Sequence, residues 1–172
     1  LGIGSAAALG AGVALAALFA ALVLGCLANH VVTGLALTLF GTGLSALVGL
    51  KYTASTIDPL APLIGGADAF ALGTIVLTGA VAVILARTKT GLILRAVGDD
   101  PASAHALGYP VRSLKLGAIL FGGALAGLAG GYLSLAYTPL WAEGMTAGRG
   151  WSARALVVFA SWHPGKLLLG AY

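Results

Sequence analysis

Residues 4–28 read GSAAALGAGVALAALFAALVLGCLA, an apolar run in which the thiol of Cys26 is the one titratable group. The first fifty residues contain no Asp, Glu, Lys or Arg, and 8% of the 172 residues are charged, whereas a soluble domain carries about a quarter. A helix of about 20 apolar residues spans the hydrocarbon core of a bilayer. Because the run also lacks strand-like alternation, the sequence predicts an all-α, polytopic helical membrane protein of the cell membrane.

Similar apolar segments follow along the chain. Spans are predicted near 4–28, 69–86 and 116–137, a short one at 151–161, and the start of a further helix at 164–172. Residues 31–50 are long enough to span but are rich in glycine and threonine, and two residues separate them from the preceding run. They favour a broken or re-entrant helix. The alternative is a plain spanning helix whose hydroxyls bond to its own carbonyls.

Broken segments suggest where a solute could pass. Irregular backbone at membrane depth is tolerated where it lines a water-filled cavity, and paired interrupted segments point to a transport site. Residues 34–41 and 153–160 resemble each other weakly. Arg154 lies in the apolar segment 151–161, where an arginine is a functional candidate. The alternative is that its side chain snorkels to the external interface. The predicted pathway lining is Asn29, Thr33, Thr38, Phe40, Arg154 and Phe159.

Small residues recur at helical spacing in two of the predicted spans. Gly123, Gly127 and Gly131 form one column, and the first span carries a similar one at Ala8, Gly12, Ala16 and Ala20. Lipid supplies no hydrophobic drive for helix association, so close contact through small residues replaces it. The glycine column is therefore predicted to pack against another helix.

Charge gives the orientation. Five of the nine basic residues lie in 87–115, which the positive-inside rule places in the cytoplasm, with loops 51–68 and 138–150 outside. This clustering indicates topology and not a nucleic-acid partner.

The cytoplasmic loop contains the signals of a short helix. Asp100 is a helix N-cap, Pro101 fits the first helical position and Gly108 fits the C′ position, so a short helix over 101–107 is expected. It could dock in a partner's groove or be an incidental turn.

The segment Leu94–Pro101 (LRAVGDDP), with Ala104 and the ALGY of 106–109, resembles the cytoplasmic coupling loop of ATP-binding-cassette importer permeases. The family in question serves branched-chain amino acids, ribose-type sugars and nucleosides. Residues 121–130 and the GRGW of 148–151 are similar to its next helix and external turn. The resemblance implies one transmembrane permease domain over 1–172, a fragment of a longer chain, for a nucleoside or simple sugar. A branched-chain amino acid permease is the alternative.

The same resemblance implies partners. The short helix would contact a separate ATPase subunit through Gly98, Asp100, Pro101, Ala104, Leu107 and Gly108. An extracytoplasmic solute-binding protein and a second permease subunit are also implied. No phosphate-binding Walker A motif occurs here, so ATP–Mg is expected on the partner ATPase and no cofactor, metal or catalytic residue on this chain. A structural membrane protein or an intramembrane enzyme is the alternative from another class.

Overall fold

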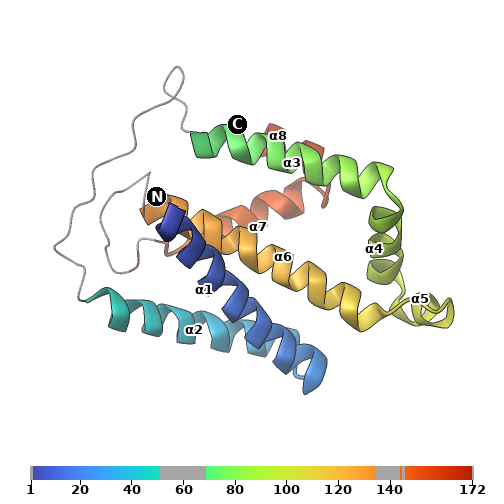
Figure 1. The fold of residues 1–172 in the computed structure, drawn as a ribbon, viewed down its shortest axis with the longest axis horizontal. Coiled ribbons are helices and arrows are strands. Elements are labelled where there is room, and N and C mark those ends of the chain that lie inside the picture. The colour runs from blue at the N-terminus through green and yellow to red at the C-terminus, as the bar shows by residue number, and fades with distance from the viewer. Residues whose placement is uncertain (1, 51–68, 135–143, 145, 172) are drawn as a thin grey trace. The chain divides into compact units, whose positions relative to one another are not determined.

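The computed structural model describes residues 2–50, 69–134, 144 and 146–171, and within them every regular element is a helix (Figure 1). This confirms the all-α prediction. In chain order the helices are α1 (Gly2–Ala20), the π-helix η1 (Ala21–Gly25), α2 (His30–Gly49), α3 (Ala69–Arg87), α4 (Lys89–Asp99), α5 (Pro101–Ala106), α6 (Val111–Tyr132), α7 (Arg149–Phe159) and α8 (Pro164–Ala171).

Three helical stretches of the described chain are long and apolar enough to cross a membrane: Gly4–Gly25, His30–Gly49 and Val111–Tyr132. A fourth passes the same test as a bent pair, Leu72–Arg87 with Lys89–Asp99, whose two arms differ in direction by 78°. The helices that meet the test carry few charges and long exposed apolar side chains such as Leu39 and Val76, as lipid-facing helices do.

The chain divides into two compact units. One comprises Leu1–Leu60 and Arg112–Met145, and so contains α1, η1, α2 and α6; the other comprises Ala61–Val111 and Thr146–Tyr172, with α3, α4, α5, α7 and α8. The prediction of a single domain over 1–172 stays a prediction.

In the first unit, α2 corrects the prediction of a broken or re-entrant helix over 31–50, because it runs without interruption from His30 to Gly49. Its hydroxyls bond back to the helix: Thr38 donates to the Gly34 carbonyl at 2.8 Å and Thr42 to the Thr38 carbonyl at 3.0 Å. Back-bonding of this kind removes the need for a cavity around these groups. The alternative of a plain helix fits the structure.

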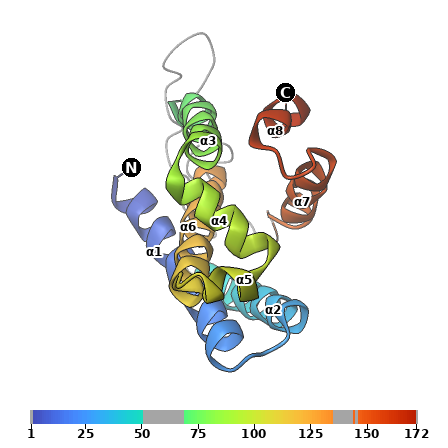
Figure 2. The same cartoon turned by 90° about the vertical axis from the view of Figure 1, so that its right-hand side faces the viewer.

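Helix α6 lies beside α1 (Figure 2). Its glycines face α1. A Cβ built on Gly127 would collide with the Ala8 carbonyl oxygen and lie 3.0 Å from Cα of Gly12. Gly123 faces Ala16 and Gly131 faces Ala8 in the same way. We call this contact the α1–α6 seam. The structure thus brings the two columns of small residues together, as expected for helices that associate through backbone contact.

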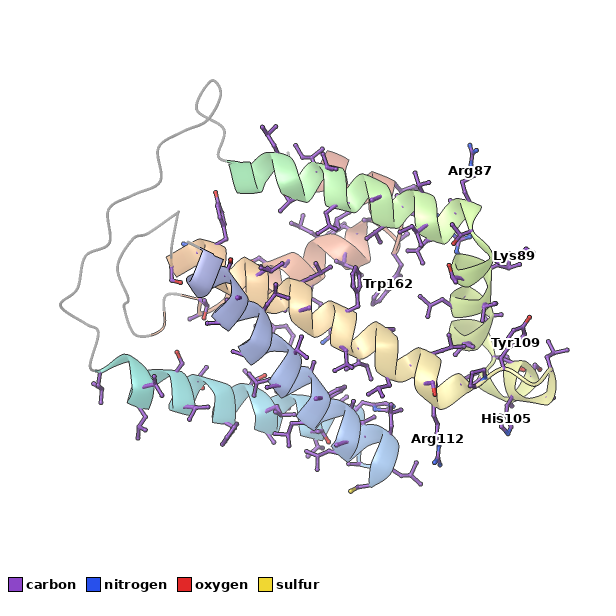
Figure 3. All side chains as sticks on the ribbon, viewed as in Figure 1. Arg87, Lys89, His105, Tyr109, Arg112 and Trp162 are labelled. Atoms are coloured by element: carbon purple, nitrogen blue, oxygen red, sulfur yellow. The ribbon has the colours of Figure 1, made fainter. Side chains whose placement is uncertain are left out.

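In the second unit, the segment predicted as loop 87–115 is mostly helical. It holds all of α4 and α5, and its last residues, 111–115, begin α6, which belongs to the first unit from Arg112 onward. The sequence places this segment between the spans predicted for 69–86 and 116–137. Its basic side chains do not prevent helix formation, since Arg87 and Lys89 extend away from their helices (Figure 3).

The second unit also contains the short helices near the end of the described chain. Ser161 and Trp162 have positive φ values of 52° and 61° between α7 and α8, so the chain breaks before Pro164 as the sequence indicated. Helix α8 contacts both α7 and α3. Residues 51–68 and most of 138–150, predicted as external loops, lie outside the described residues, as do residues 135–137 at the end of the span predicted for 116–137.

Candidate functional site

Helix α5 has a complete N-terminal cap. One carboxylate oxygen of Asp100, Oδ1, accepts hydrogen bonds from the backbone N–H groups of Ala102 at 2.9 Å and Ser103 at 3.3 Å. The Ser103 hydroxyl donates to the other oxygen, Oδ2. Pro101 occupies the first helical position, where it has no N–H to leave unpaired. Asp100 therefore starts the helix at a fixed residue.

The C-terminal end is capped as well. Gly108 has a φ of +86°, its N–H donates to the His105 carbonyl at 2.9 Å, and the Tyr109 N–H donates to the Ala104 carbonyl at 3.2 Å. These are the two hydrogen bonds of a Schellman motif. A helix of six residues is unstable alone, and the two caps hold it in place.

The exposed face of α5 differs in part from the predicted contact set. Leu107 is 76% exposed, and the His105 side chain points outward (Figure 3). Ala104, in contrast, is only 2% exposed and sits in the contact between α5 and α4. Its side chain is buried and does not belong to the exposed face of α5. Gly98, on α4, has open space around its Cβ position.

The residues predicted to line a pathway do not form one cluster in either unit. In the first unit, the Asn29 side chain caps α2 by accepting from the Val31 N–H at 2.9 Å. Thr33 is buried at 7% exposure, Thr38 is bonded within its helix and Phe40 is 54% exposed. The polar groups of Asn29 and Thr38 are thus occupied by neighbouring backbone.

The remaining two pathway candidates lie on α7, in the second unit. The Arg154 guanidinium carbon lies 6.0 Å from the ring centroid of Trp151, at the outer limit of a cation–π contact. Phe159 is 88% exposed. No group of His, Cys, Asp or Glu side chains within the described residues could hold a metal ion.

A family model describing the permease component of branched-chain amino acid transport systems matches residues 1–172 of the chain. The chain belongs to this permease family. This membership agrees with the apolar helices in identifying the chain as a membrane protein.

The curated relatives that match this chain are named for the transport of a sugar or of nucleosides. The permease is 40% identical to a putative glucose ABC transporter permease protein of Haloferax volcanii, over 94% of this chain and 54% of the relative. It is 31% identical to a nucleoside ABC transporter permease protein of Lactococcus lactis, over 51% of this chain and 28% of the relative. A guanosine ABC transporter permease protein of Bacillus subtilis is 32% identical, over 47% and 25%.

The permease therefore spans about half the length of the first of these relatives and less of the other two. No solved structure matches it. The resemblance to the importer permease family, and its leaning toward sugars and nucleosides, are confirmed by the family model and these relatives.

Sequence reasoning missed two residues beside the site, Thr88 and Gly91, because it treated the start of α4 as loop. Thr88 is the N-cap of α4, and its hydroxyl oxygen accepts from the Gly91 N–H at 3.1 Å. A signal was available: a threonine followed by apolar residues at 91, 94 and 97 predicts a capped helix with one buried face. Gly91 and Val97 are indeed buried.

The capping role of Asp100 gives a pH prediction. The hydrogen bond from the Ser103 hydroxyl, followed by the N–H groups of Ser103 and Ala102, holds the pKa of the Asp100 carboxyl below its ordinary value of 3.8. A lowered folded-state pKa means that the cap stabilises α5 above pH 3.8 and fails as the pH falls through the lower, folded-state value.

We expect amide hydrogen exchange at Ala102 and Ser103 to stay slow from neutral pH down to below 3.8 and to accelerate only there, relative to intrinsic rates. Asp100→Ala should lose this protection at every pH, and Asp100→Asn, which keeps an acceptor oxygen, should retain most of it. Equal protection in all three proteins would contradict the capping role.

Proposed function

We propose that this chain is part of the membrane subunit of an ATP-binding-cassette importer, with α5 as its contact to a separate ATPase subunit. Family membership supplies the class of protein. The observation that carries the contact is α5 itself, a helix of six residues fixed at both ends by caps, with Leu107 exposed beside its last turn. An exposed leucine on a short rigid helix is suited to insertion into a partner's groove.

The charge pattern supports a cytoplasmic position for this contact. Arg87 ends α3, and Lys89 and Arg95 lie on α4, the two helices that precede α5 in the chain. An excess of basic residues marks the cytoplasmic side of a membrane protein. The ATPase subunits would bind and hydrolyse ATP–Mg there, and an extracytoplasmic solute-binding protein and a second permease subunit would complete the importer in the cell membrane.

The transported solute is proposed from the relatives. Proteins named for glucose, nucleoside and guanosine transport share 31–40% identity with this chain. We propose a simple sugar or a nucleoside, with a branched-chain amino acid as the alternative. Uptake of radiolabelled glucose, guanosine and leucine by cells that express the complete transporter distinguishes the three.

ATP hydrolysis would drive alternating access. Closure of the ATPase subunits displaces α5, and the displacement reorients the membrane helices so that the solute site faces one side and then the other. The wide exposure of Phe40, Phe159 and Trp162 leaves apolar surface for a second permease subunit and for lipid. In this account the chain contributes no catalytic group.

Crosslinking tests the proposed contact. In the full-length permease with Cys26→Ser, we expect a photoreactive probe on Leu107→Cys to capture a protein with a Walker A motif, identified by mass spectrometry. The same probe on Ala104→Cys is the matched control, since that position is 2% exposed and should label and crosslink poorly. A well-labelled Leu107→Cys that captures no nucleotide-binding protein in the assembled transporter would refute the proposal.

A further inference from the structure

We propose that Thr88 and Gly91 are positioning residues that lock α3, α4 and α5 into one rigid lever, so that movement of α5 is delivered to α3 without loss. This inference rests on the proposed function, because it takes α5 as the contact with the ATPase. We call residues 84–91, where α3 turns into α4, the elbow. The two helices differ in direction by 78° at this point.

The Thr88 hydroxyl joins the two helices of the elbow. It donates to the Ile84 carbonyl in the last turn of α3 at 2.6 Å and accepts from the Gly91 N–H in the first turn of α4 at 3.1 Å. The Thr90 hydroxyl lies 2.8 Å away. Since a hydroxyl offers one proton and two lone pairs, these three partners use its full hydrogen-bonding capacity, with Thr90 as the donor. One side chain thus ends α3 and begins α4.

Because Gly91 has no side chain, α3 and α4 approach closely enough for the Thr88 hydroxyl to bond to both helices. A Cβ on Gly91 would collide with the Ile84 carbonyl oxygen and lie 2.6 Å from both Cα and the carbonyl oxygen of Leu85. All three obstacles are backbone atoms, which cannot rotate away as a flexible side chain can. Any side chain at position 91 must therefore push α4 away from α3 and change the bend.

The connection between α4 and α5 is also a single residue, Asp100. Asp100 is the C-cap of α4, where its N–H donates to the Ala96 carbonyl at 3.0 Å, and it is also the N-cap of α5. Helices α4 and α5 contact each other, and Val97 and Ala104 are each 2% exposed. One residue, Thr88, separates α3 from α4, and one residue, Asp100, separates α4 from α5. Both are fixed by their caps, so no flexible linker remains between α3 and α5.

A rigid lever has a mechanical consequence for an importer. Packed elements rearrange between discrete arrangements and do not deform continuously, so a displaced α5 must carry α3 with it. A loosened elbow would let the ATPase close and hydrolyse ATP while α3 stays in place. Weakening the elbow should therefore uncouple hydrolysis from transport and leave the contact with the ATPase intact.

The chain offers matched variants for this test. Gly91→Ala introduces the backbone collision, whereas Gly79→Ala makes the same change on α3, at a position where a Cβ meets open space. Thr88→Val removes the hydroxyl at nearly constant shape, whereas Thr88→Ser keeps it. Loss of such a cap corresponds to a factor of roughly 5 to 30 in the ratio of ordered to disordered arrangements. Thr88→Val keeps the test decisive if Gly91→Ala does not fold.

The first readout is transport per ATP hydrolysed by the complete transporter in liposomes. The second is the distance between spin labels at Val83→Cys on α3 and Leu107→Cys beside α5, in a Cys26→Ser background. Both labelled positions are exposed, at 59% and 76%. In the parent protein we expect one narrow distance distribution that is the same without nucleotide and with ATP trapped. Gly91→Ala and Thr88→Val should broaden this distribution and lower transport per ATP severalfold, while Gly79→Ala and Thr88→Ser should match the parent.

The outcomes separate this inference from the proposed function. Two results would overturn the lever and leave the proposed function standing. One is a spin-label distance in the parent protein that changes when ATP is trapped. The other is full coupling in a folded Gly91→Ala or Thr88→Val protein that still crosslinks to the ATPase through Leu107→Cys. Failure of the parent protein to crosslink to any ATPase would instead overturn the proposed function itself.

Discussion

Gly127→Ala is expected to destabilise the full-length permease by about 1–3 kcal/mol, the usual cost of adding a methylene to a well-packed contact. The new Cβ meets the carbonyl oxygen of Ala8 and Cα of Gly12, both backbone atoms of α1. The α1–α6 seam must therefore open along its length, and in a bilayer no hydrophobic drive would restore the contact. Thermal unfolding of the purified permease in detergent measures the loss as a lower Tm.

Two controls make this prediction specific to the seam. Gly130→Ala adds the same methyl group to α6 where nothing lies within 4 Å, so it should match or slightly exceed the parent in stability. Gly131→Ala meets only the Cβ of Ala8, so adding Ala8→Gly should rescue it. Ala8→Gly should not rescue Gly127→Ala, whose obstacles are backbone atoms. A Gly127→Ala protein as stable as Gly130→Ala would show that α1 and α6 do not pack through this seam.

Gly108→Val is expected to abolish most ATP-driven transport while leaving the amount of permease in the membrane near that of the parent. The φ of +86° at Gly108 costs an ordinary L-residue roughly 1–2 kcal/mol, and a β-branched residue fits this region worst. Because a Cβ there would meet no atom within 4 Å, the effect comes from the backbone alone. The Schellman bonds that end α5 would break, and a helix of six residues has little else to hold it.

Gly108→Asn is the matched control, since asparagine tolerates the left-handed region and occurs at this helix position. It should keep most transport. The measurement is solute uptake against ATP hydrolysis in proteoliposomes, together with crosslinking from Leu107→Cys. We expect Gly108→Val to lose uptake and crosslinking together. Uptake at the parent level in Gly108→Val would mean that the fixed end of α5 is unimportant for coupling.

Helix α5 shows how far the sequence reaches. Asp100, Pro101 and Gly108 predicted a helix over 101–107, and the structure has it at Pro101–Ala106 with Leu107 as the C-cap. Capping is a local property, determined within a few residues by hydrogen-bond capacity and backbone freedom. The same holds for the columns at Gly123, Gly127 and Gly131, where helical spacing alone places small side chains on one face.

Helices α2 and α4 show where sequence reasoning fails. Glycines and threonines in 31–50 predicted a break, yet Thr38 and Thr42 bond to preceding carbonyls and α2 continues. The sequence predicts a connecting loop over 87–115 with one short helix, yet Thr88 caps a second helix, α4, directly after α3. In both cases the same residue types serve in loops and in helices, and the partner available to each hydroxyl decides between them.

The sequence alone determined that this chain is a helical membrane protein and where α5 begins and ends, because hydropathy and capping act over short distances. The tertiary structure decided which helix covers the glycine column, that Ala104 is buried beneath α5, and that α3 and α4 meet at Gly91 with no room for a side chain. These are contacts between residues far apart in the chain or across a bend, and no local pattern records the distance between two backbones.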